Sequence, residues 1–129
     1  MARVIIVLLI LLGASLYFPK TRPVVMEFLG PVVNPVLRWQ TDGEMDRIAR
    51  ELESLNRQGS NIPMPGASFQ NWMERRFMGG ANEDAWGVNY TFHIWRDSTG
   101  IVSNGPDREI GTADDLVQLL SFRLEPSRR

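Results

Sequence analysis

Acidic residues gather in one short stretch of the chain, residues 103–116, which reads SNGPDREIGTADDL. Its acids outnumber its bases by four to one, with Asp107, Glu109, Asp114 and Asp115 against Arg108. The formal charge of the stretch is therefore −3 (1 − 4), whereas that of the whole chain is −1. Like charges this close repel one another, so the stretch requires either open solvent or a bound cation.

Calcium is the cation that best suits this composition. Ca²⁺ takes about six to eight oxygen ligands, mixes carboxylates with backbone carbonyls and tolerates irregular geometry. Side-chain oxygens are offered by Ser103, Asp107, Asp114 and Asp115, while Gly105, Pro106 and Gly111 would let the backbone fold around an ion. The spacing of an EF-hand loop is absent. The residues alone leave two interpretations open, a calcium site and a solvated acidic loop.

Little in the chain suggests catalysis. It has no cysteine and only one histidine, His93, which excludes thiolate chemistry and a multi-histidine zinc site built from this chain alone. DSTG at 97–100 resembles the active-site motif of aspartic proteases, but its spacing differs by one residue and these residue types suit a hairpin turn. We therefore expect that the protein is not an enzyme and that it has no small-molecule substrate. The chain is not basic, so we expect no nucleic-acid partner.

The N-terminal segment is strongly apolar. The fifteen residues Val4 to Phe18 contain no charge and are bracketed by Arg3 and by Lys20 and Arg22. As a helix they would span roughly 22 Å, against a bilayer core of about 30 Å. No signal-peptide cleavage site follows. We interpret residues 1–22 as a membrane-anchor helix, with a buried core helix as the alternative; basic residues on both sides leave its orientation open.

Prolines mark the next segment, residues 23–41. Prolines at positions 19, 23, 31 and 35 stand among apolar residues. Each interior proline removes one helical hydrogen bond and clashes with the preceding turn. The pattern therefore predicts a kinked connector and not one regular helix.

A globular domain is predicted over residues 42–125. Thr41 and Glu44 form a capping box, and Gly59 is placed to end the helix that follows. The apolar face of this helix recurs at helical spacing through Met45, Ile48, Ala49, Leu52 and Leu55. Its polar face offers the i,i+4 ion pairs Asp46–Arg50, Arg47–Glu51 and Glu53–Arg57. A shorter amphipathic helix is predicted at 68–80, with Phe69, Trp72, Met73 and Phe77 on one side.

Beyond Gly80 the hydrophobic period changes to two. Alternation over 88–96 predicts a strand, the turn at 97–100 makes a hairpin with 101–103, and 116–124 is a third strand. Residues 126–129 are a tail. The fold class is therefore α+β: an N-terminal apolar helix, then an amphipathic helix packed on a small three-stranded antiparallel sheet.

Two motifs in this order resemble the C-terminal region of the major pseudopilin of type II secretion systems, a type IV pilin-like family. The first is DAWGVNY at 84–90, where the family has Asp-Pro-Trp-Gly-x-x-Tyr before its first strand. The second is the acidic stretch, where the family has a Ser-x-Gly-x-Asp-Gly loop ending in Gly-Thr-x-Asp-Asp-Ile. Ala85 stands for the proline and Arg108 for the second glycine. Element order is similar over about 42–125.

The resemblance implies a pilin-like fold and a calcium ion in the loop. The implied ligands are the side chains of Ser103, Asp107, Asp114 and Asp115 and the backbone carbonyls of Gly105 and Ile110. Trp86 is expected to pack over the base of the sheet. The implied function is that of a structural subunit in the bacterial inner membrane, with its globular domain in the periplasm or outside the cell. Its partners would be copies of itself or other pilin-like subunits.

The N-terminus departs from the family pattern. Pilin-like proteins carry a prepilin peptidase site, glycine before Phe-Thr-Leu-Ile-Glu, whereas this chain begins Met-Ala-Arg-Val-Ile-Ile-Val and has no glutamate before Glu27. The alternative function is therefore a calcium-binding envelope domain that does not assemble and acts as an adaptor.

Overall fold

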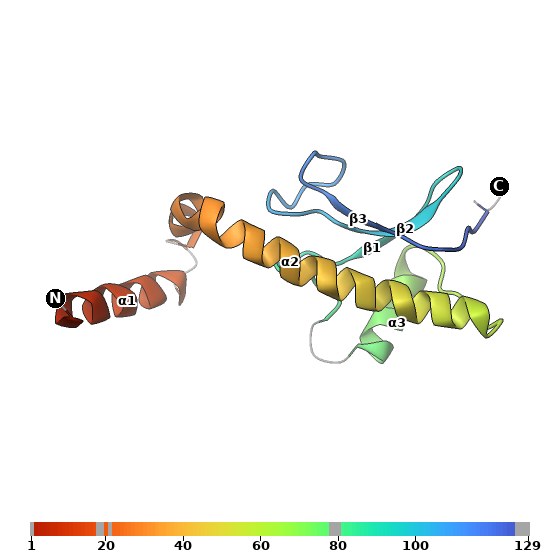
Figure 1. Cartoon of the computed structure of the whole chain (residues 1–129), viewed down its shortest axis with the longest axis horizontal. Helices are drawn as coiled ribbons and strands as arrows, with labels where there is room; N and C mark the ends of the chain where they lie inside the picture. The colour runs from red at the N-terminus through yellow and green to blue at the C-terminus, as the bar shows by residue number, and fades with distance from the viewer. Residues whose placement is uncertain (1, 18–19, 21, 78–80, 126–129) are drawn as a thin grey trace. The chain divides into compact units, whose positions relative to one another are not determined.

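The computed structural model describes residues 2–17, 20, 22–77 and 81–125. They form an α+β chain with three helices and a three-stranded antiparallel sheet (Figure 1). In chain order the elements are α1 (Ala2–Tyr17), α2 (Arg22–Arg57), α3 (Ala67–Arg76), β1 (Thr91–Ile94), β2 (Thr99–Ser103) and β3 (Leu116–Leu119). Two units divide the chain between Val36 and Leu37. The tail predicted at 126–129 lies outside the described residues, as do the last three residues of the helix predicted at 68–80.

The first unit contains α1 and the beginning of α2. α1 covers the apolar stretch as far as Tyr17; Phe18, where the stretch was predicted to end, is not among the described residues. Eight successive apolar side chains, Val4 to Leu11, are each between 55 % and 65 % exposed. Across the part of the chain that the structure describes, no helix is both long and apolar enough to cross a membrane.

The second helix corrects the prediction of a kinked connector at 23–41. α2 is assigned as one helix of 36 residues, and it includes both Pro31 and Pro35. Each proline removes a single backbone donor, and the turns on either side keep the remaining hydrogen bonds, so a helix continues past it with a local bend. Two prolines four residues apart are therefore not sufficient to interrupt this helix.

The predicted capping box is wrong because the helix begins at Arg22 and not at Thr41. Thr41 lies well inside α2 and not at its start, and it is fully buried. Its hydroxyl accepts a hydrogen bond from the backbone N–H of Ala85 at 3.3 Å. A threonine inside a helix is tolerated when its side chain is satisfied in this way by a distant segment.

The other end of α2 confirms the prediction. Gly59 has φ of 65°, the left-handed conformation that glycine adopts without steric cost. Its N–H donates to the carbonyl of Asn56 at 3.1 Å, and the N–H of Ser60 donates to that of Leu55 at 3.0 Å. These two bonds are the Schellman motif, which satisfies carbonyls that a helix end leaves unpaired.

Three antiparallel strands form the sheet in the order β1-β2-β3, as predicted. Phe92 lies opposite Ile101, and the β1–β2 turn is closed by the Trp95 N–H, which donates to the Ser98 carbonyl at 2.9 Å. β1 and β3 are shorter than predicted, since β1 covers only Thr91–Ile94 and β3 ends at Leu119. Thr99 and Gly100, which were predicted in the turn, belong to β2. The chain beyond it returns to α2, where the Ser121 N–H donates to Glu53 at 2.9 Å.

The core lies between the sheet and helices α2 and α3, and it confirms the predicted apolar faces (Figure 1). Phe69 of α3 and Phe92 of β1 stack with ring centroids 5.4 Å apart. Buried side chains come from every element of this unit: Met45, Ile48, Ala49, Leu52, Phe69, Met73, Trp86, Tyr90, Phe92, Ile101 and Leu116.

Ion pairs on the polar face of α2 follow the prediction in part. Asp46 and Arg50 pair at 2.5 Å. Glu51 instead contacts Arg76 of α3 at 2.8 Å, a pairing between helices that sequence spacing did not indicate. Glu53 is the acceptor for Ser121 described above. Glu51 and Glu53 therefore connect α2 at its surface to α3 and to the chain beyond β3, whereas the core is formed by apolar side chains.

Candidate metal-binding loop

The acidic stretch is a loop that joins β2 to β3. Ser103, the last residue of β2, lies opposite Leu116, the first residue of β3, so strand pairing closes the base of the loop. Immediately above, the two sides of the loop meet at Gly105 and Asp114. A Cβ atom on Gly105 would lie 2.2 Å from the Asp114 carbonyl oxygen, and Gly105 has φ of 69°. Only glycine fits at position 105. We call the close contact between Gly105 and Asp114 the loop neck.

A buried carboxylate lies beneath the loop neck. Asp84, in the segment before β1, is only 5 % exposed. Its Oδ1 accepts hydrogen bonds from the backbone N–H groups of Trp86 at 3.0 Å and Val88 at 2.9 Å. Its Oδ2 accepts one from the Ser103 hydroxyl at 2.6 Å. Buried carboxylates are rare unless they are paired in this way.

Ser103 carries this connection on to the loop. Its Oγ accepts a hydrogen bond from the N–H of Gly105 at 3.2 Å, and the residue is fully buried. A continuous chain of hydrogen bonds thus runs from Asp84 through Ser103 to the loop neck. Sequence reasoning did not select Asp84, although it begins the DAWGVNY motif; its position there was the signal that could have found it.

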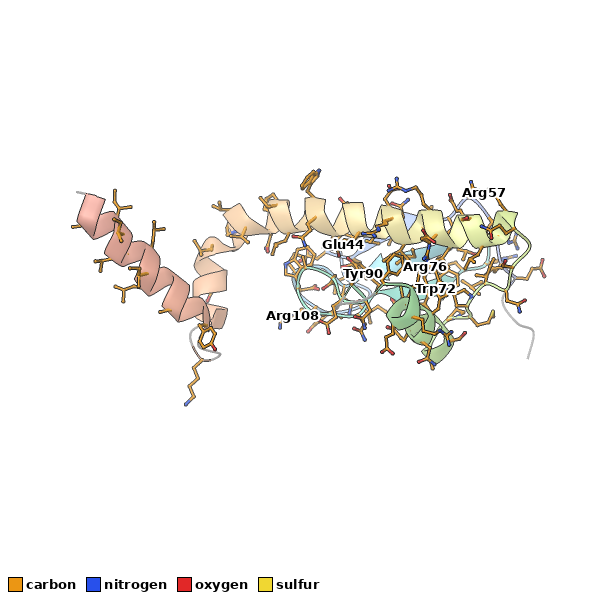
Figure 2. The ribbon with its side chains drawn as sticks, turned by 90° about the horizontal axis from the view of Figure 1, so that it is seen from below. Glu44, Arg57, Trp72, Arg76, Tyr90 and Arg108 are labelled. Carbon is orange, nitrogen blue, oxygen red and sulfur yellow. The ribbon has the colours of Figure 1, made fainter. Side chains whose placement is uncertain are left out.

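The segment that holds Asp84 is itself fixed against both helices. The Tyr90 hydroxyl donates to Glu44 Oε2 of α2 at 2.7 Å, and Figure 2 shows the two side chains facing each other. Burial, and after it the bond to Glu44, raises the pKa of Tyr90 far above its ordinary value. Gln70 of α3 donates to the Tyr90 carbonyl at 2.7 Å. Trp86 is 6 % exposed and belongs to the core, as predicted for this residue.

The outer part of the loop is exposed and is braced by its own hydrogen bonds. The Glu109 N–H donates to Asp107 Oδ1 at 3.0 Å, and this bond, followed by the Thr112 hydroxyl, holds the pKa of Asp107 below its ordinary value. The Asp115 carboxylate accepts from the Gly111 N–H at 2.7 Å and from the Thr112 hydroxyl at 3.1 Å.

The predicted ligands do not form one cluster of acidic side chains. Among residues 2–17, 20, 22–77 and 81–125, no three histidine, cysteine, aspartate or glutamate residues are grouped so as to hold a metal ion. Gly105 and Asp114 meet at the neck, whereas Asp107 and Ile110 lie on the exposed part of the loop, Ile110 being 58 % exposed. Any ion held here would depend on carbonyl and amide oxygens as much as on carboxylates.

Two features of the loop suit an ion bound by oxygen atoms. The Oδ1 atom of Asn104 is buried and has no hydrogen-bond partner among the described residues, while its Nδ2 donates to the Arg108 carbonyl at 3.3 Å. The neck brings carbonyl-bearing backbone from both sides of the loop into contact. The available donors are all oxygens, which is the ligand chemistry that calcium prefers.

Ser103 is the predicted ligand that fits least well. Its hydroxyl donates to Asp84 and accepts from Gly105, so an ion bound through that oxygen would displace one of these hydrogen bonds. Removing a partner from a buried polar group costs about 1–3 kcal/mol. The position of Ser103 beneath the neck favours a structural contribution to the loop.

Comparisons with models of protein families, with curated proteins and with solved structures each found no match. The fold and the loop together define an α+β unit in which an acidic loop joins the second and third strands and rests on a buried aspartate.

Proposed function

We propose that the chain is a membrane-anchored, calcium-stabilised, pseudopilin-like structural subunit of a bacterial type II secretion or pilus-like assembly. The observation that carries the proposal is the loop between β2 and β3, with its glycine neck and its buried, unpartnered Asn104 oxygen. The order of elements supports it, because the antiparallel sheet on which a helix packs carries that loop between its second and third strands, and the DAWGVNY motif directly precedes β1.

Calcium would be held by the carbonyls of Gly105 and Ile110 and by the carboxylates of Asp107, Asp114 and Asp115. Because no three acidic side chains are grouped among the described residues, the outer part of the loop would have to close around the ion on binding. A bound divalent cation would offset the formal charge of the loop and link its two sides. The role of the protein is to supply a preformed neck, so that less conformational entropy is lost on binding. Protons compete with the ion for the carboxylates, and the lowered pKa of Asp107 keeps that group ionised to lower pH.

The exposed apolar side chains of α1 support the membrane part of the proposal. At about 25 cal/mol per Å², removing eight large apolar side chains from water is worth many kcal/mol. α1 has 16 residues and would extend about 24 Å, which is less than a bilayer core of about 30 Å. A bilayer accommodates a short apolar helix by thinning or by snorkelling of flanking basic side chains, and basic residues flank this stretch in the sequence.

Membrane fractionation of bacteria that express the full-length chain tests the anchor. We expect the intact chain in the membrane fraction and a Leu8→Asp, Leu11→Asp variant in the soluble fraction, because charges in an apolar helix oppose insertion. A Val117→Asp, Leu119→Asp variant, which changes two exposed apolar residues of β3, is the control and should stay with the membrane. Intact wild-type chain in the soluble fraction would contradict the proposal.

Negative-stain microscopy of the membrane-extracted chain tests assembly. Filaments that form with calcium and disappear with chelator are expected of a pseudopilin-like subunit. A non-assembling, calcium-binding envelope adaptor is the second candidate. A monodisperse chain that binds calcium would support the adaptor and reject the filament subunit.

A further inference from the structure

We infer that Asp84 is a positioning residue for the acidic loop: through the Ser103 hydroxyl it holds Gly105 at the loop neck and thereby sets how tightly the loop binds a divalent cation. The inference rests on the calcium binding proposed above. It assigns a role to a residue that is separated from Ser103 by 19 positions and is not itself a proposed ligand.

The two carboxylate oxygens of Asp84 have different tasks. Oδ1 braces the segment before β1 by accepting the N–H groups of Trp86 and Val88. Oδ2 accepts the Ser103 hydroxyl at 2.6 Å, within the usual range for an O–H···O hydrogen bond. Bracing the local turn requires only Oδ1, so the second oxygen serves the loop.

Ser103 is suited to pass this constraint on. Its hydroxyl hydrogen is committed to Asp84, and this fixes the direction in which its oxygen lone pairs point. One of those lone pairs accepts the Gly105 N–H at 3.2 Å. Without the hydroxyl, a buried N–H and a buried carboxylate oxygen would both lose a partner.

The loop neck has little room to adapt to such a change. Gly105 lies so close to the Asp114 carbonyl that a Cβ atom would overlap it, so rotation of the Gly105 peptide moves that residue against Asp114. Gly105 and Asp114 each contribute an oxygen to the proposed site. Mutating a residue that orients a metal ligand through a hydrogen bond typically lowers the affinity for the metal about 10–100-fold.

Calcium titration of the full-length chain in detergent, followed by isothermal calorimetry, tests this role. Ser103→Ala removes the link to the loop and leaves the Oδ1 brace intact. Asp84→Asn keeps an acceptor for Trp86 and Val88 but replaces Oδ2 by an amide that cannot accept the Ser103 hydroxyl. For both variants we expect the Kd for calcium to rise at least about tenfold.

Thr99→Val is the matched control. Thr99 is also fully buried, lies at the opposite end of the same strand, and accepts the Leu124 N–H through its hydroxyl at 2.9 Å. The control should lower the melting temperature in chelator as Ser103→Ala does, yet bind calcium with the wild-type Kd. Amide exchange in chelator gives a second readout: Gly105 should exchange faster in Ser103→Ala and Asp84→Asn than in Thr99→Val.

The outcomes separate this inference from the proposed function. Wild-type Kd values and unchanged Gly105 exchange in Asp84→Asn and Ser103→Ala would overturn the positioning role alone. A wild-type chain that binds no calcium would overturn the calcium proposal and this inference with it. An equal loss of affinity in Thr99→Val would show that general destabilisation, and not the link to the neck, weakens binding.

Discussion

Acidic side chains occupy two contrasting regions of the globular unit. In the segment 84–90, Asp84 is buried and accepts hydrogen bonds from backbone and hydroxyl donors held in place by the core. In the loop 104–115, Asp107 is exposed and Asp115 is bonded only to neighbours within the same loop. In the first region the folded chain provides hydrogen-bond donors for the carboxylate. In the second, the carboxylates are left to interact with solvent or with an added cation.

The stability of the buried region should therefore be independent of calcium and salt, whereas that of the loop should depend on both. A buried hydrogen bond to a charged acceptor contributes roughly 1.5–3 kcal/mol and is screened little by salt. Exposed carboxylates of like charge repel one another and are screened by ions. We therefore expect substitutions in 84–90 to lower stability with or without calcium, and substitutions in the loop to change mainly the response to calcium.

Trp86 gives the largest expected effect in the buried region. Trp86→Ala should lower the free energy of unfolding by about 3–5 kcal/mol, because it opens a cavity in the core beside Asp84. Trp39, which is 78 % exposed, provides the control: Trp39→Ala should change that free energy by no more than about 0.5 kcal/mol. Urea denaturation in chelator measures both, and a loss below about 1 kcal/mol for Trp86→Ala would contradict the contrast.

The loop should show a comparable effect only when calcium is present. An ion that binds the folded chain alone adds about 2.7 kcal/mol at a hundredfold excess over its Kd. Asp114→Ala combined with Asp115→Ala should abolish the rise in melting temperature between chelator and millimolar calcium. Glu109→Ala removes a loop charge that is not a proposed ligand, and it should keep the rise. Identical wild-type melting in chelator and in calcium, or an equal rise with magnesium, would refute a calcium site.

Tyr90 tests the buried region through pH. Burial and Glu44 raise its pKa in the folded state, so above pH about 10 the unfolded chain releases this proton while the folded chain retains it. The contribution is fully present below that pH and is lost as the pH rises beyond it. Tyr90→Phe should cost about 1 kcal/mol at neutral pH and should flatten the alkaline decline in unfolding free energy. Tyr17→Phe, at a residue 88 % exposed, is the control and should change the unfolding free energy at neutral pH by no more than about 0.5 kcal/mol.

The surface pair Asp46–Arg50 should have the smallest effect. Its side chains are 49 % and 67 % exposed, and exposed i,i+4 pairs on helices contribute only about 0.3–0.5 kcal/mol. A double-mutant cycle with Asp46→Asn and Arg50→Gln measures this coupling. A coupling above about 1 kcal/mol would show that an exposed ion pair contributes nearly as much to stability as the buried hydrogen bonds of Asp84, and would contradict the difference between the two regions.

Sequence periodicity by itself determined most of the fold. Helical spacing from Met45 to Leu52 identified the buried face of α2, and the alternation through Tyr90 and Phe92 identified β1. Gly59 indicated the end of α2, and the composition of 103–116 placed an acidic loop between two strands. These predictions succeeded because each depends on residues within a few positions of one another, where backbone geometry alone fixes the pattern.

The tertiary structure decided what local patterns could not. It turned Thr41 from an expected helix cap into a buried acceptor for Ala85, 44 residues away. It also placed Asp84 beneath the loop. A buried polar side chain takes whichever donor or acceptor the packed core brings to it, and only folding brings them together.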